Sequence, residues 1–160
     1  MARLYTAVFS SVAVTAAQDL FELVAPADAI VQVYRIEMSQ STETGDAAEE
    51  SLPLLIKRGI GSVTSGTGGT TPTAQPVEDG DAAFGGTVEV NNTTKMVVGT
   101  GTIETIGSHN WNLRVPFDKV FLPEERIIIS PSNRITVELV NAPADSVTMS
   151  GTITFAEIGG

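Results

Sequence analysis

The alternation of apolar and polar residues in the last third of the chain predicts β-strands. Ile135, Val137 and Leu139 alternate with polar residues, and a period of two is typical of a strand with one buried face. The same alternation runs through residues 147–155. Residues 141–145, Asn-Ala-Pro-Ala-Asp, have turn chemistry and separate the two stretches. We therefore expect a C-terminal hairpin with one apolar and one hydroxyl-rich face.

Further strands are predicted along the rest of the chain. Residues 111–117 repeat the spacing, with Trp111 and Phe117 facing the core and Pro116 indicating a sheet edge or a bulge. The first half of 30–38 is apolar on both faces, which predicts a central strand. Shorter candidates are 5–14, 20–24, 52–57, 87–90, 95–98, 102–106 and 125–129. About ten strands at short intervals are typical of sandwiches and jelly rolls. We expect an all-β fold, an antiparallel two-sheet β-sandwich of jelly-roll-like form, as a single domain over 1–160.

Two segments interrupt this series of predicted strands. Residues 40–51 are polar and acidic and are expected to project as a loop, in which Asp-Ala-Ala-Glu at 46–49 has capping-box spacing for one helical turn. Residues 61–86 are rich in Gly, Ser, Thr and Pro, and so long a connection is uncommon inside a compact domain. This composition favours an extended arm that becomes fixed only against a partner surface.

Composition and charge exclude several classes of function. The chain has 160 residues and no cysteine, so disulfides, thiolate nucleophiles and thiolate metal sites are excluded. The formal net charge of −10 repels phosphate backbones, so we expect no nucleic-acid partner. A run of about 18 apolar residues is absent, so no membrane-spanning helix is expected. A signal peptide ending near Ala16 would be unusually short, and we expect the chain to be made inside the cell.

The chemistry of the chain does not indicate an enzyme. His109 is the only histidine, which excludes mechanisms that need two imidazoles, and no Gly-x-Ser-x-Gly elbow accompanies it. A structural or interface role for His109 is therefore expected. Glu78, Asp79 and Asp81 offer oxygen ligands for calcium, but their spacing does not match an EF-hand and favours a solvated patch. Carboxylate pairs for glycoside hydrolysis remain open, although nothing selects a pair. We expect no catalytic residue, metal ligand or cofactor.

Several segments resemble small proteins of tailed-phage and prophage genomes, including head decoration or cement proteins. The segments that carry the resemblance are 25–30, 39–50, 64–72, 89–94, 130–134 and 150–159. The resemblance implies a jelly-roll-like domain, often a homotrimer, which sits on the outer capsid over the junctions between capsomers. The implied partners are the major capsid protein and copies of the chain itself. The implied location is the virion surface, after synthesis in the host cytoplasm.

A cement protein needs a rigid body and segments that reach its neighbours. The residues expected at a capsid or subunit interface are Met1, Ala2, Arg3, Leu4, Ser65, Thr67, Thr70, Thr71, Pro72, Pro76 and His109. The alternative is a carbohydrate- or receptor-binding module of a phage tail or surface structure, which would expose Trp111, Tyr5 or Tyr34 beside carboxylates. A degenerate cupin-like enzyme is a third possibility, against which the single histidine counts.

Overall fold

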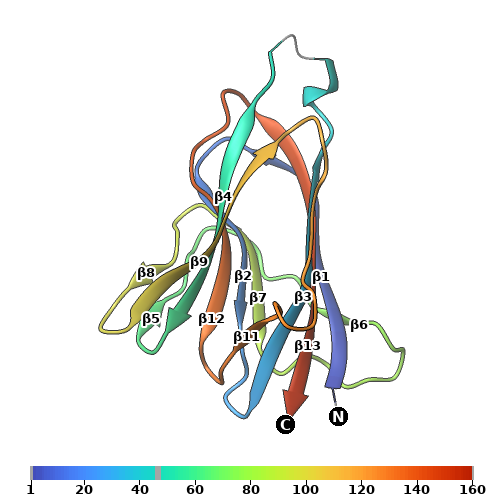
Figure 1. The fold of residues 1–160 in the computed structure, drawn as a ribbon, viewed down its shortest axis with the longest axis vertical. Helices are drawn as coiled ribbons and strands as arrows, with labels where there is room; N and C mark the ends of the chain where they lie inside the picture. Colours follow the sequence, from blue (N-terminus) through green and yellow to red (C-terminus); the bar gives the residue numbers. More distant parts are fainter. Residues whose placement is uncertain (1, 46–47, 160) are drawn as a thin grey trace.

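The computed structural model describes residues 2–45 and 48–159. Two antiparallel sheets face each other (Figure 1). Sheet A contains, in spatial order, β10 (Phe117–Val120), β3 (Ala29–Gln40), β13 (Val147–Gly159), β1 (Ala2–Val14) and β6 (Gln75–Pro76), and β11 (Ile127–Ile129) also pairs with β3. Sheet B contains β7 (Thr87–Asn92), β2 (Gln18–Val24), β12 (Arg134–Leu139), β4 (Ser51–Ile60) and β9 (Thr102–Asn112). A small third sheet pairs β5 (Val63–Thr64) with β8 (Val97–Val98).

The strand order confirms the expected jelly-roll sandwich. If residues 61–101 are set aside, sheet A has the order β10-β3-β13-β1 and sheet B the order β9-β4-β12-β2. Consecutive strands therefore lie mostly in opposite sheets, and the chain forms the two Greek keys of a jelly roll. Residues 61–101 are inserted between β4 and β9, and we call this segment the insertion.

The expected C-terminal hairpin is wrong, although both of its strands exist. β12 pairs with β2 and β4 in sheet B, whereas β13 pairs with β1 and β3 in sheet A. Residues 140–146 therefore cross from one sheet to the other. Alternation with a period of two shows which side chains of a strand face the core. It does not show in which sheet the strand lies, and β12 and β13 lie on opposite sides of the core.

Residues 111–117 are likewise divided between the sheets and do not form one strand. β9 ends at Asn112 in sheet B, and β10 begins at Phe117 in sheet A. Pro116 lies in the connection, where a residue without a backbone N–H ends the ladder. Trp111 is buried and its Nε1 donates a hydrogen bond to the Val115 carbonyl at 2.7 Å.

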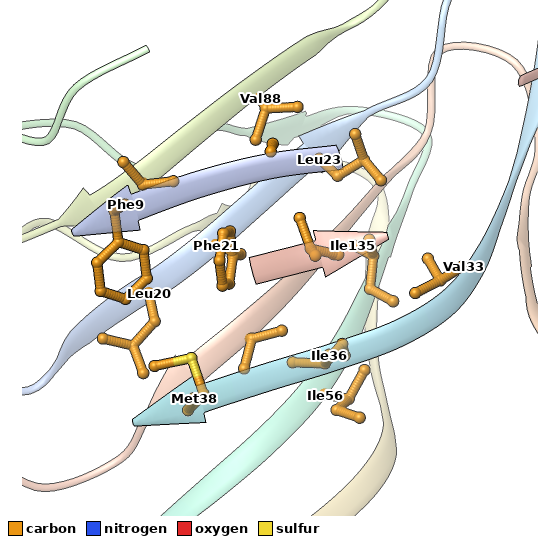
Figure 2. Close-up of a cluster of buried hydrophobic side chains, with 14 of the residues drawn as sticks. Phe9, Leu20, Phe21, Leu23, Val33, Ile36, Met38, Ile56, Val88 and Ile135 are labelled. Atoms are coloured by element: carbon orange, nitrogen blue, oxygen red, sulfur yellow. The ribbon is translucent and has the colours of Figure 1, made fainter. Parts of the chain in front are cut away.

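The core lies between the sheets and draws apolar side chains from both. Phe9, Val33, Ile36 and Met38 of sheet A meet Phe21 and other residues of sheet B (Figure 2). Each such side chain contributes about 1.5–3 kcal/mol by leaving water. β3 occupies the central position predicted for it, with β13 on one side and β10 and β11 on the other.

The insertion is folded onto its own domain. β7 adds to the edge of β2, β6 adds to the edge of β1, and backbone bridges join Thr67 to Thr94 and Thr70 to Val90. Residues 61–86, which were expected to become fixed only against a partner surface, therefore have contacts within their own domain at Thr67, Thr70 and β6. The insertion contacts the outer face of sheet B, so Thr136 and Glu138 of β12 are buried and the strand is covered on both faces.

The acidic loop that follows β3 lies at the end of the molecule opposite the chain termini (Figure 1). It contains a 3₁₀ turn, η1 (Glu43–Gly45), in which the backbone N–H of Glu43 donates to Oε1 of Gln40 at 2.8 Å. The helical turn predicted at 46–49 starts in residues that lie outside the described part of the chain.

Candidate functional site

The outer face of sheet A carries two rows of cross-strand partners beside the chain termini, and most of their members are apolar. Ala2 pairs with Ile158, which pairs with Ile30. Leu4 pairs with Ala156, which pairs with Gln32, and Gln32 pairs with Ile128. Cross-strand partners lie on the same side of a sheet, and the alternate residues Tyr5 and Phe155 are fully buried in the core. We call the outward surface of Ala2, Leu4, Ile30, Ile128 and Ile158 the terminal face.

Further apolar residues extend the terminal face, and carboxylates border it. The backbone N–H of Val77 donates to the Leu4 carbonyl at 2.8 Å, which places Val77 beside Leu4 with 57 % of its area exposed. Ile128 is 49 % exposed. Exposed acidic residues adjoin these positions along the chain, at Asp28 before β3 and at Glu78 and Asp79 after Val77. The result is an apolar surface with an acidic margin.

A buried ion pair supports the terminal face from inside. Arg3 Nη2 lies 3.0 Å from Oε1 of Glu157, and the backbone N–H of Gly85 donates to Oε2 of the same carboxylate at 2.8 Å. The hydroxyl of Tyr5 donates to the Ala82 carbonyl at 2.8 Å. Burial, followed by the charge of Glu157, raises the pKa of Tyr5 above its usual value. Residues 77–86 therefore pack against this end of the sandwich.

The structure brings together only some of the predicted interface residues. Ala2 and Leu4 lie on the terminal face, and Pro76 pairs with Tyr5 next to them. Arg3 points the other way, toward Glu157, with which it forms an ion pair. Met1 lies outside the described residues.

The remaining predicted interface residues lie elsewhere. Ser65 accepts a hydrogen bond from Arg134 of sheet B, and Thr67 and Thr70 form the bridges of the insertion. Thr71 and Pro72 line a hollow beside Phe84. These residues therefore do not join the terminal face in one surface.

His109 lies on β9, at the edge of sheet B. Its ring centroid is 5.4 Å from that of Phe117 in an edge-to-face contact. Burial, assisted by the charge of Lys119, lowers the pKa of His109 below its usual value. With Ile106, Lys119 and Phe121 it lines a hollow between β9 and β10. Within residues 2–45 and 48–159, no group of three or more His, Asp or Glu side chains is placed to hold a metal ion.

Three buried carboxylates beneath the insertion were missed by the sequence analysis. Glu22 is fully buried and accepts a hydrogen bond from the backbone N–H of Gly66 at 2.8 Å. Asp19 accepts one from the backbone N–H of Met96 at 2.7 Å. Glu138 forms ion pairs with Lys57 and Lys95. These carboxylates hold the insertion on sheet B through Gly66 on one side and through Lys95 and Met96 on the other, so their role is structural.

The pKa values of two of these carboxylates differ in direction. Burial raises the pKa of Asp19 to about 6, against the opposing effect of the Met96 hydrogen bond. Burial also acts to raise the pKa of Glu138, but hydrogen bonds from Lys57 and Lys95 outweigh it and hold the pKa below its usual value.

We expect Asp19→Asn to stabilise the protein at pH 8 and to have little effect at pH 4. The raised pKa means that the folded state favours protonated Asp19, so this contribution to stability is present below pH 3.8 and is lost as pH rises through about 6. Asparagine stays neutral and still accepts a hydrogen bond. A pKa shift of this size corresponds to a gain of about 2–3 kcal/mol in the free energy of unfolding at pH 8. Urea unfolding of both proteins at pH 4, 6 and 8 would measure the difference.

Asp118→Asn is the matched control, because the hydrogen bond from Arg35 lowers the pKa of Asp118. Ionised Asp118 therefore stabilises the folded state, and replacing it should lower the free energy of unfolding at pH 8 more than at pH 3. An Asp19→Asn effect that does not change with pH would contradict the expectation.

The chain is a jelly-roll domain with the terminal face on sheet A and an insertion that buried carboxylates hold on sheet B. No protein-family model matches the chain, and no curated protein or solved structure matches it either. In the described part of the chain, no helix is long and apolar enough to cross a membrane.

Proposed function

We propose that this chain is a structural virion protein, a capsid decoration protein that docks on the outer capsid through its terminal face. The observation that carries the proposal is the cluster of apolar side chains on the terminal face, where Ala2 and Ile128 are exposed and Leu4, Ile30 and Ile158 are partly exposed. Clustered exposed apolar side chains mark interaction surfaces. The jelly-roll fold recurs in viral capsid proteins, and the resemblance to phage head proteins agrees with it, although a fold alone does not define a function.

The chemistry of the terminal face supports a particular kind of surface on the proposed capsid partner. Its apolar centre matches an apolar patch on the major capsid protein, and its margin at Asp28, Glu78 and Asp79 matches lysine and arginine around that patch. The net charge of −10 disfavours contact between two copies through this same face. Docking should therefore weaken as salt concentration rises.

Contacts between copies of the chain belong to another surface. We assign them to the hollow beside His109, where Ile106 is 40 % exposed and Leu122, next to Phe121, is 60 % exposed. The edges of β9 and β10 flank this hollow. A homotrimer would have three times the chain mass of 16.7 kDa. Light scattering of the purified protein should give that mass, and a monomer at micromolar concentration would contradict the trimer.

The alternative, a carbohydrate- or receptor-binding module, was expected to expose Trp111, Tyr5 or Tyr34, and the positions of these rings do not support an aromatic platform. Trp111 is 2 % exposed and Tyr5 is fully buried. The ring of Tyr34 is covered by the guanidinium of Arg126, whose Cζ lies 3.9 Å from the ring centroid. These three aromatics therefore do not form a platform for a sugar ring.

The double variant Leu4→Asp/Ile128→Asp should lose docking while remaining folded. Two carboxylates in the apolar centre would need to be desolvated without partners, so we expect capsid affinity to fall about 100-fold. Empty capsids of the source virus would be mixed with each variant and followed by co-sedimentation and cryo-electron microscopy.

Val98→Asp is the control, because Val98 is apolar and 55 % exposed, comparable to Ile128, but lies on β8 of the insertion. It should bind as the unaltered chain does. Absence of lattice density with the unaltered chain, or equal binding by the double variant, would overturn the proposal.

A further inference from the structure

A groove crosses the outer face of sheet A, farther along the strands than the terminal face. Its volume is about 370 Å³. Asp118, Glu37, Thr152 and Val8 form one row of cross-strand partners along it, because Asp118 pairs with Glu37, Glu37 with Thr152, and Thr152 with Val8. Ser39 and Ser150 form the next row. The remaining lining residues are Ser10, Pro116, Phe9, Met38, Phe117 and Gly151.

A β-bulge in β1 shapes one wall of the groove. The register with β13 shifts between Phe9 and Val12, and Ser11 has a positive φ of 55°. The backbone N–H of Ser11 donates to Oγ of Ser150 at 2.9 Å, which fixes the bulge. Bulges bend a strand and redirect its side chains, and they recur beside binding sites. The groove is therefore bounded by the bulge on one side and by the β10 edge on the other.

Arg35 orders the two carboxylates of the groove. Its Nε and Nη2 donate to the two oxygens of Asp118 at 2.8 and 2.7 Å, and Nη2 lies 3.1 Å from Oε1 of Glu37. The hydrogen bond from Arg35 also holds the pKa of Asp118 below its usual value, so that this group stays ionised. Arg35 is committed to these pairs, and the lining carries two carboxylates, so the groove disfavours anionic ligands.

We propose that this groove binds a neutral saccharide. Fixed carboxylates accept hydrogen bonds from adjacent sugar hydroxyls, and charge-assisted bonds of this kind are about twice as strong as neutral ones. The hydroxyls of Ser10, Ser39, Ser150 and Thr152 both donate and accept, as sugar hydroxyls do. Val8, which is 53 % exposed, and Pro116 supply apolar contact for the C–H face of the ring. The volume lies within the range of small-molecule sites, about 300–1,000 Å³.

The site does not depend on capsid docking, since the groove and the terminal face use different rows of sheet A. It also uses none of the aromatic residues expected for a saccharide module. A divalent cation is disfavoured as the occupant, because the described residues provide no cluster of three carboxylate or imidazole groups.

The test is a glycan array with the purified chain, followed by NMR titration with the neutral sugars that bind and with their sialylated or sulfated forms. Neutral sugars should bind and shift the amide signals of Glu37 and Thr152, whereas the anionic forms should bind at least tenfold more weakly. Glu37→Gln and Thr152→Val should each weaken binding about tenfold, or 1.4 kcal/mol.

Thr154→Val is the matched control, because Thr154 follows Thr152 on the same face of β13 but lies outside the groove lining. It should bind sugar as the unaltered chain does. The proposal is overturned if no neutral glycan binds at millimolar concentration, if both groove variants bind normally, or if only anionic sugars bind.

Discussion

Glu22→Ala is expected to lower the free energy of unfolding by about 3–5 kcal/mol. Glu22 is fully buried, and its carboxylate lies between the backbone N–H of Gly66 at 2.8 Å and Nη1 of Arg134 at 3.4 Å. Alanine would leave a largely buried guanidinium without this carboxylate and one backbone donor unpaired. The insertion would also lose a contact that holds it on sheet B.

Urea unfolding measures the loss, and limited proteolysis within 61–86 reports release of the insertion. Glu104→Ala is the matched control, because Glu104 pairs with Arg58 at the surface, at 2.7 Å. An exposed pair contributes about 1 kcal/mol or less. Equal losses of unfolding free energy in the two variants, or an unchanged proteolysis rate in Glu22→Ala, would contradict the role of Glu22 in holding the insertion on sheet B.

Phe155→Ala is expected to cost about 3–5 kcal/mol, since it removes a fully buried ring from β13. The ring centroid of Phe155 lies 5.8 Å from that of Tyr5 and 4.9 Å from that of Phe84. Phe84 belongs to the insertion, so this aromatic cluster joins the insertion to the end of the sandwich. The cavity would therefore loosen residues 77–86 as well as the core.

Thermal and urea unfolding give the stability of Phe155→Ala, and hydrogen exchange at Gly85 gives the local effect. Phe117→Ala is the control, because Phe117 is only partly buried against the core at the opposite edge of sheet A. It should cost less and leave exchange at Gly85 unchanged. A similar cost for both variants would show that the aromatic cluster has no special role.

The fold class could be predicted because period-two alternation is a local signal. Residues 147–155 and 135–139 carry it plainly, and both are strands. The pairing of these strands could not be predicted, because alternation identifies the buried face of a strand and not the sheet in which the strand lies. The crossover at 140–146 and the end of β9 at Asn112 were therefore missed.

The buried carboxylates that hold the insertion on sheet B have no local signal in the sequence. Asp19 and Glu22 stand in the apolar segment 18–24, where polar residues indicate a solvent-facing side. Their hydrogen-bond donors are backbone N–H groups 77 and 44 residues away. Glycine at 66 is needed because a Cβ there would lie 2.5 Å from the Thr94 carbonyl oxygen. A Gly-rich composition alone therefore predicted an arm where the chain forms a packed layer.

The terminal face was predicted only in part. The N-terminal residues were expected at an interface, and Ala2 and Leu4 do face outward. The predicted strand began at residue 5, with the N-terminal residues before it reaching a neighbour, whereas β1 of sheet A begins at Ala2. Alternation within β1 therefore turns Arg3 inward to Glu157. Ile30, Ile128 and Ile158 come from distant positions, and only the register brings them together.

The antiparallel pairing of β1 with β13 has a consequence for fusion proteins. Ala2 lies opposite Ile158, so both chain ends leave the molecule beside the terminal face (Figure 1). A tag or displayed peptide attached at either end would stand between that face and its partner. The connection between β3 and β4 leaves the sheets at the opposite end (Figure 1). Cargo inserted there would point away from the terminal face, so under the proposed docking this loop is the better position for surface display.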